Sequence, residues 1–87
     1  MIFEFERQRK LIKNQFDHWL KEAKTAKERF NESANNGDHI TYYHWRMRYN
    51  WTIEAATNYA NKMGETGGYG IVLKDEMEEQ IKKVIEA

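Results

Sequence analysis

The histidines are the first side chains to consider for chemistry in this chain of 87 residues. His18 and Glu22 stand four residues apart, a spacing that would place two metal ligands on one face of a helix. A zinc site normally uses three or four protein ligands, so this pair alone is too small. His39 and His44 stand five residues apart and would lie on different helical faces. We therefore expect no metal site and no cofactor.

Nucleophiles are as scarce as metal ligands. The chain has no cysteine, and its single serine, Ser33, has no histidine close to it in the sequence. The glycine-rich residues 64–70 invite comparison with a phosphate-binding loop, but no Gly-Lys-Ser/Thr follows them and a helical pattern precedes them. A helix end and a flexible linker explain these glycines better. We therefore expect no enzymatic activity.

Residues 42–51 interleave aromatic rings with two arginines, Arg46 and Arg48. Such a segment can bind nucleic acid, because rings stack on bases and guanidinium groups pair with phosphates. On a helix, however, Arg46 and Arg48 point about 160° apart and form no single basic patch. The simpler interpretation is that the rings pack in the core. A small nucleic-acid-binding regulator is therefore the alternative function, and contact of either arginine with nucleic acid stays open.

Hydrophobic spacing predicts the helices that position these residues. Over residues 3–34 the apolar positions recur at alternating steps of three and four, which is typical of an amphipathic helix, and only Arg9 interrupts them. Residues 35–37, Asn-Asn-Gly, predict a turn, and Asp38 is a suitable N-cap for a second helix at about 39–63. A short turn between two helices of similar length favours an antiparallel hairpin.

The second helix carries two apolar stripes, which lie about 150° apart on a helical wheel, whereas a surface helix needs only one. One stripe is expected to pack on the first helix and the other needs a second neighbour. We assign the core between the two helices to six residues: Phe16, Trp19, Ala23, Tyr49, Ile53 and Ala56. The other stripe consists of Ile40, Tyr43, Met47 and Trp51.

The third segment follows the glycine-rich linker, which begins where Gly64 is placed to end the second helix. Residues 69–73 are apolar and β-branched, which favours an extended conformation. Asp75 and Glu78 match the Asp-x-x-Glu form of a capping box, so a helix is expected at about 75–86. The fold class is therefore all-α, a long antiparallel helical hairpin plus a short C-terminal helix joined by a Gly-rich linker, in one domain.

Coverage of the second stripe decides where a partner can bind. The third segment is the only other apolar part of the chain, and the four glycines of its linker are costly to order, so we expect it to cover the stripe only in part. Trp, Tyr, Met and Arg are enriched at the centres of protein interfaces. We predict a binding surface made of Tyr43, Met47, Arg48 and Trp51, which takes another protein or a second copy in a homodimer.

Composition sets the class of protein. The net charge is zero, with 40% hydrophobic and 32% charged residues, as in a globular domain whose charge does not demand an acidic or basic partner. No apolar run is long enough to span a membrane, and the alternation Phe3-Glu4-Phe5-Glu6 is not that of a signal peptide. The chain has no cysteine and so no disulfide, which fits a cytoplasmic protein. We therefore expect a cytoplasmic protein that binds no membrane.

These features predict a small non-catalytic protein-binding module that acts as an inhibitor, adaptor or regulator. Accessory proteins of phages and mobile elements that block a host or defence protein share this size and composition, although no motif links the chain to them. In outline the predicted hairpin resembles the secreted helical-hairpin proteins that are marked by a Trp-x-Gly turn. Here the turn is Asn35-Asn36-Gly37 and holds no tryptophan, so the resemblance implies no function.

Overall fold

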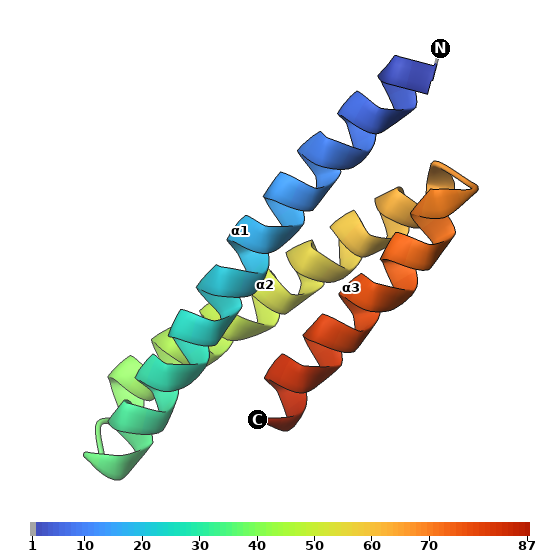
Figure 1. The fold of residues 1–87 in the computed structure, drawn as a ribbon. Coiled ribbons are helices and arrows are strands. Elements are labelled where there is room, and N and C mark those ends of the chain that lie inside the picture. Colours follow the sequence, from blue (N-terminus) through green and yellow to red (C-terminus); the bar gives the residue numbers. More distant parts are fainter. Residues whose placement is uncertain (1) are drawn as a thin grey trace.

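Three helices joined by two short turns make up the fold (Figure 1). The computed structural model describes residues 2–87, with side chains from Phe5 onward, so the side chains of Phe3 and Glu4 lie outside the described part. Helix α1 (Ile2–Asn35) runs antiparallel to α2 (His39–Glu65), and α3 (Tyr69–Glu86) folds back along α2. No strand occurs among the described residues. The predicted all-α hairpin with a shorter C-terminal helix is confirmed.

The turn between α1 and α2 forms as the sequence predicts. Gly37 takes a left-handed backbone conformation, with a φ of 70°, which glycine enters without a steric penalty. Asp38 caps α2, because its Oδ1 atom accepts a hydrogen bond of 3.1 Å from the backbone N–H of Thr41. Hydrogen bonds from the side chain and backbone of Thr41 hold the pKa of Asp38 below its usual value.

The core between α1 and α2 is aromatic at the end near their shared turn. Phe30 meets Tyr42 and Tyr49 edge-to-face, with ring centroids 5.7 and 5.3 Å apart. Trp19 and Ile53, which the sequence places in the core, are only partly buried and pack against its edge. The other four expected core residues are buried: Phe16, Ala23, Tyr49 and Ala56.

The turn between α2 and α3 is shorter than the sequence predicts. α2 continues one residue past Gly64, and only residues 66–68 separate it from α3, so the predicted linker at 64–70 is wrong in length. Gly67 and Gly68 form the turn, because both take positive φ angles, 72° and 48°. Only these two glycines of the run therefore serve as turn residues.

Helix α3 also begins earlier than the sequence predicts. It starts at Tyr69, so residues 69–73 are helical rather than extended, and the expected helix at 75–86 is too short. Asp75 lies inside the helix and is not its N-cap, so no capping box with Glu78 starts α3. Packing of α3 against α2 outweighs the β propensity of its first turn.

Gly70 allows α3 to lie close against the end of α2. A Cβ atom at this buried position would overlap the hydroxyl of Thr66 and the carbonyl oxygen of Met63. From this close approach, α3 extends back along the hairpin and buries three apolar side chains, which are Met77, Ile81 and Val84. Glycine is thus required here by packing rather than by chain flexibility.

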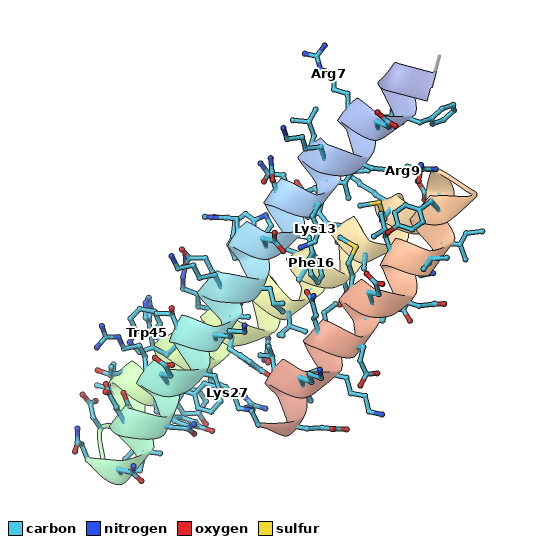
Figure 2. The ribbon with its side chains drawn as sticks, in the orientation of Figure 1. Arg7, Arg9, Lys13, Phe16, Lys27 and Trp45 are labelled. Carbon is cyan, nitrogen blue, oxygen red and sulfur yellow. The ribbon has the colours of Figure 1, made fainter. Side chains whose placement is uncertain are left out.

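Arg9 of α1 holds the turn between α2 and α3 (Figure 2). Its Nε atom donates a hydrogen bond of 3.0 Å to Oγ1 of Thr66, and its Nη2 atom donates one of 2.9 Å to the carbonyl oxygen of Gly67. Arg9 is the residue that interrupts the apolar spacing of α1. The interruption therefore marks a tertiary contact that spans most of the chain.

Lys27 of α1 holds the other end of α3 (Figure 2). Its Nζ atom donates hydrogen bonds of 2.6, 3.0 and 2.6 Å to the carbonyl oxygens of Val84, Ile85 and Ala87. The last carbonyl groups of a helix lack partners within the helix and carry partial negative charge, so an ammonium group suits them. Arg9 and Lys27 together fix both ends of α3 against α1.

Candidate functional site

An apolar stripe runs along the side of α2 opposite the face that is buried in the core. Its members follow one another at steps of three, four and four residues, which places them in one row on a helix. They are Ile40, Tyr43, Met47 and Trp51, with 86%, 67%, 70% and 54% of their surface exposed. The stripe contains the three apolar residues of the predicted binding surface and leaves all of them open to solvent.

The direction of α3 explains why it leaves the stripe open. Ala56 and Met63 stand nine and 16 residues after Met47, which is about 160–180° around the helix from it. Both are fully buried, and α3 approaches α2 at Met63, where Gly70 packs. α3 therefore lies on the far side of α2, and the expected partial coverage of the stripe by the third segment is wrong.

Trp51 is covered in part by α1 instead. Its ring packs edge-to-face on that of Trp19, with centroids 4.9 Å apart and an angle of 79° between the planes. The His18 ring also packs edge-to-face on the Trp19 ring, with centroids 4.8 Å apart. Such aromatic pairs contribute about 0.5–1.5 kcal/mol beyond the area they bury. Trp19 thus connects the edge of the core to the stripe.

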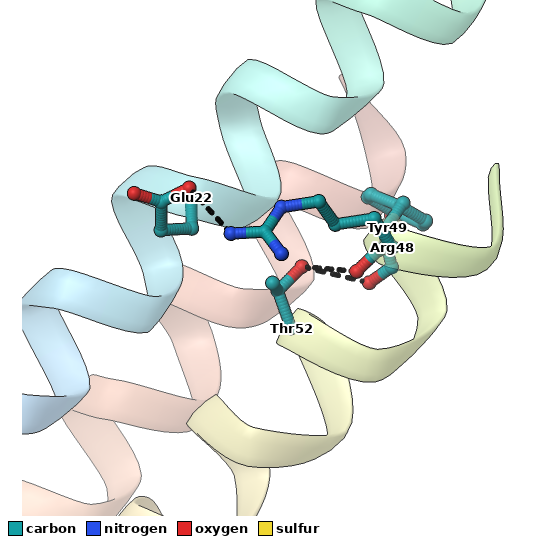
Figure 3. Close-up of polar contacts among 4 residues, drawn as sticks. All are labelled: Glu22, Arg48, Tyr49 and Thr52. Carbon is teal, nitrogen blue, oxygen red and sulfur yellow. Dashed lines mark hydrogen bonds and ion pairs between the residues drawn. The ribbon is translucent and has the colours of Figure 1, made fainter. Parts of the chain in front are cut away.

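Arg48, the fourth predicted site residue, follows Met47 of the stripe directly in the sequence. Its side chain is held by Glu22 of α1 (Figure 3). Its guanidinium group pairs with the carboxylate of Glu22 on α1 at 3.3 Å and lies 5.9 Å from the centre of the Trp51 ring. The buried Thr52 hydroxyl donates to the backbone carbonyl oxygens of Arg48 and Tyr49 at 2.9 and 3.0 Å. The side chain of Arg48 therefore forms a half-exposed polar border.

A shallow hollow continues from Trp51 toward the C-terminal end of α2. Its volume is about 500 Å³, and its apolar wall is formed by Trp19, Ala55 and Tyr59. Its polar rim consists of Asn58, Asn61, Lys62 and Glu65. The sequence prediction missed Tyr59, although the step of four from Trp51 to Ala55 and again to Tyr59 could have indicated it.

Arg46 is directed away from Arg48, as the helical spacing predicts. Its guanidinium carbon lies 5.0 Å from the centre of the Phe30 ring and 5.6 Å from that of Tyr49, so it stacks over the aromatic end of the core. Arg46 and Arg48 are thus both engaged within the chain, on different sides of α2.

The other candidate chemical groups are dispersed. Within residues 5–87, whose side chains the structure describes, no three His, Cys, Asp or Glu residues come together as a metal site. The Ser33 hydroxyl donates a hydrogen bond of 3.0 Å to the Arg29 carbonyl oxygen of its own helix. No helix in the described part of the chain is long and apolar enough to cross a membrane.

Comparison with known proteins finds no match: no protein-family model fits the sequence, and no curated protein or solved structure is significantly similar to it.

Proposed function

We propose that the protein is a non-catalytic protein-binding module, which acts as an inhibitor, adaptor or regulator by docking a partner on the apolar stripe. The observation that carries the proposal is the row of four large apolar side chains along α2, each more than half exposed. Small monomeric proteins rarely expose a contiguous apolar patch without a role in binding.

The surroundings of the stripe resemble the centre of a protein interface. Trp51 provides a large ring that Trp19 already orients, so little conformational freedom is lost when a partner covers it. The neighbouring hollow can accept one side chain of the partner, and Asn58 and Lys62 supply a polar rim to it. Arg48 forms a second polar border where Glu22 holds it.

A nucleic-acid-binding regulator remains the second candidate, and the arginines argue against this cluster as its site. Arg48 pairs with Glu22, and Arg46 stacks on aromatic rings of the core, so neither guanidinium group is free for phosphate without breaking these contacts. A salt titration separates the two candidates, because binding to nucleic acid weakens steeply as salt rises.

The test is to capture the partner from the source cell with tagged protein, identify it, and measure its affinity for purified variants. Trp51→Ala should weaken binding by about 2 kcal/mol, which is about thirtyfold in Kd. Met47→Glu places a charge in the middle of the stripe and should weaken binding more. Ile71→Ala is the matched control, since Ile71 is equally exposed but lies on α3.

The proposal is decided by comparing the affinity of the two stripe variants with that of the Ile71→Ala control. Binding that survives Trp51→Ala and Met47→Glu but is lost in Ile71→Ala would place the partner on α3. Capture of nucleic acid alone, with an affinity that falls steeply with salt, would support the regulator instead.

A further inference from the structure

A second hollow, the lysine groove, lies between α1 and α3, and no residue of α2 lines it. Its volume is about 800 Å³, and the buried residues Leu20 and Val84 are part of its wall. Two carboxylates border it, Asp17 and Glu28. Five lysines line it: Lys13, Lys21, Lys24, Lys27 and Lys83. The groove is therefore apolar at its base and positively charged at its edges.

Part of this positive charge makes no ion pair among the described side chains. Lys13 pairs with Asp17, and Lys27 binds the terminal carbonyl groups of α3. The ion pairs found among the described side chains include none made by the other three lysines, which are Lys21, Lys24 and Lys83. An occupant of the groove is therefore expected to be acidic.

The flank of α3 that borders the groove carries a complementary pattern. Lys83 and Gln80 line the groove. Glu76 precedes Lys83 by seven residues, which is close to two helical turns, so it lies on the same flank, where it is exposed. The flank is thus acidic toward its beginning and basic toward its end. A second α3 laid antiparallel on this flank brings each Glu76 opposite a Lys83.

We propose that a second copy of this chain docks in the lysine groove, with the two α3 helices antiparallel about a two-fold axis. Such an interface is self-complementary, so each ion pair between Glu76 and Lys83 occurs twice. Lys24 of α1 adds to the ion pair between Glu76 and Lys83. Lys27 binds the carbonyl oxygen of Ala87, and Lys24 and Lys83 each lie about one turn before these two residues, so they lie at the same level of the groove. Lys24 and Lys83 therefore meet the same carboxylate of the second copy.

The same register adds an apolar contact. Val72 lies about one turn before Glu76 on α3 and is 50% exposed. In the antiparallel arrangement it falls opposite Ala87, at the end of the groove where Val84 is buried. Charge then sets the register and salt sensitivity of the dimer, and this apolar contact contributes to its affinity.

A nucleic acid fits the groove less well than a second copy does. The described residues that line the groove include no aromatic residue and no arginine, so bases would find no ring to stack on. The carboxylates of Asp17 and Glu28 would also lie close to a phosphate backbone.

Dimerisation through the groove leaves the apolar stripe of each copy free, because no residue of α2 lines the groove. One dimer would then present two stripes, which strengthens binding to a partner that offers two sites. This inference stands independently of the proposed function, since a dimer can form whether or not the stripe binds a protein.

The test is a charge exchange measured by sedimentation velocity over a concentration series at low and high salt. The wild type should dimerise at low salt and dissociate as salt rises. Lys83→Glu or Glu76→Lys alone places like charges opposite each other twice, so each should weaken the dimer about tenfold or more. The double variant restores opposite charges and should recover a dimer close to that of the wild type.

Matched controls lie on another flank of the same helix. Lys82→Glu and Glu78→Lys make the same changes in net charge one or two residues away, where they break only the pairs with Glu86 and Lys74. Both controls should keep the wild-type dimer. Recovery in the double variant also shows that the single variants fail at the interface and not in folding, which circular dichroism checks directly.

Three outcomes overturn the proposal. The first is a wild type that stays monomeric at low salt up to about 1 mM protein. The second is a dimer whose stability does not change in the charge-exchange variants but is lost in Met47→Glu, which assigns the dimer interface to the apolar stripe. Alternatively, a monomer binds a single-stranded oligonucleotide and loses it in Lys24→Glu and Lys83→Glu, which assigns the groove to nucleic acid.

Discussion

The two apolar faces of α2 are alike in residue type and differ in environment. One face, which includes Tyr49, Ala56 and Met63, is buried against α1 and α3. The other is the apolar stripe, whose tyrosine, methionine and tryptophan remain more than half exposed. Both faces hold aromatic and sulfur-containing side chains, so hydrophobicity does not distinguish the core face from the exposed one.

The direction of α3 makes the difference between the two faces. The turn at residues 66–68 is too short for α3 to pass around α2, and Gly70 brings α3 directly against Met63. Arg9 of α1 then holds the turn from the other side. A few local contacts at one end of the molecule thus decide which face of a long helix becomes the core.

The largest effect is expected from truncation of the buried face. Phe16→Ala removes a ring that is fully buried between the helices, and should lower the free energy of unfolding by about 3–5 kcal/mol. Met47→Ala removes a side chain of the stripe and should change it by less than about 0.5 kcal/mol. Urea denaturation of both variants measures the contrast. A large loss in Met47→Ala would show that something covers the stripe in solution.

The contact that directs α3 is tested by Gly70→Ala. The added methyl group would overlap the Thr66 hydroxyl and the Met63 carbonyl oxygen, so the helix ends must move apart, at a cost of about 1–3 kcal/mol. Ile71→Ala is the control, because Ile71 follows Gly70 on α3 but is half-exposed. A Gly70→Ala variant that melts at the temperature of the wild type would mean that this approach does not position α3.

Local patterns were sufficient to predict α1, the first turn and the beginning of α2. Hydrophobic spacing indicated the helices, Asn-Asn-Gly indicated the turn, and Asp38 indicated the N-cap. These features depend on neighbours in the sequence, such as the hydrogen bond from the Thr41 N–H to Asp38 that caps α2. Local patterns failed at the glycine-rich run, because they do not indicate that Gly67 and Gly68 form the turn while Gly70 packs inside a helix. The packing of Gly70 depends on the backbone at the end of α2, which its own neighbours in the sequence do not reveal.

The candidate site was predicted in part for the same reason. Tyr43 and Met47 could be identified as members of a second stripe, but their exposure depends on where α3 goes. The interruption at Arg9 was visible in the sequence, while its partner Thr66 lies 57 residues away and no local pattern connects the two. The lysine groove is formed by residues of α1 and α3 that only the tertiary fold brings together.

A smaller effect is expected where the two faces meet through Trp19 and Trp51. Trp19 is partly buried at the edge of the core, so Trp19→Ala should cost about 2–3 kcal/mol, less than a fully buried ring. Trp51→Ala should cost about 1 kcal/mol, mostly the lost edge-to-face contact at 4.9 Å. The double variant should reveal a coupling of about 0.5–1.5 kcal/mol between the rings. If Trp51→Ala costs as much as Trp19→Ala, Trp51 belongs to the core and the binding surface lies elsewhere.

The smallest effect concerns the protonation of Tyr49 on the buried face. Burial raises the pKa of Tyr49 above the ordinary value of 10.0, against a smaller opposing effect of Arg46. The fold therefore favours the neutral phenol, whose contribution to stability is complete below the unfolded pKa and is lost as the pH rises through the folded one. Between about pH 9 and pH 11 the Tyr49→Phe variant should lose less stability than the wild type, as measured by urea denaturation at each pH. Comparison with the variant removes the titration of all other groups, which the two proteins share. Equal losses would mean that the phenol of Tyr49 meets the same environment folded and unfolded, and the distinction between the two faces of α2 would then fail at this residue.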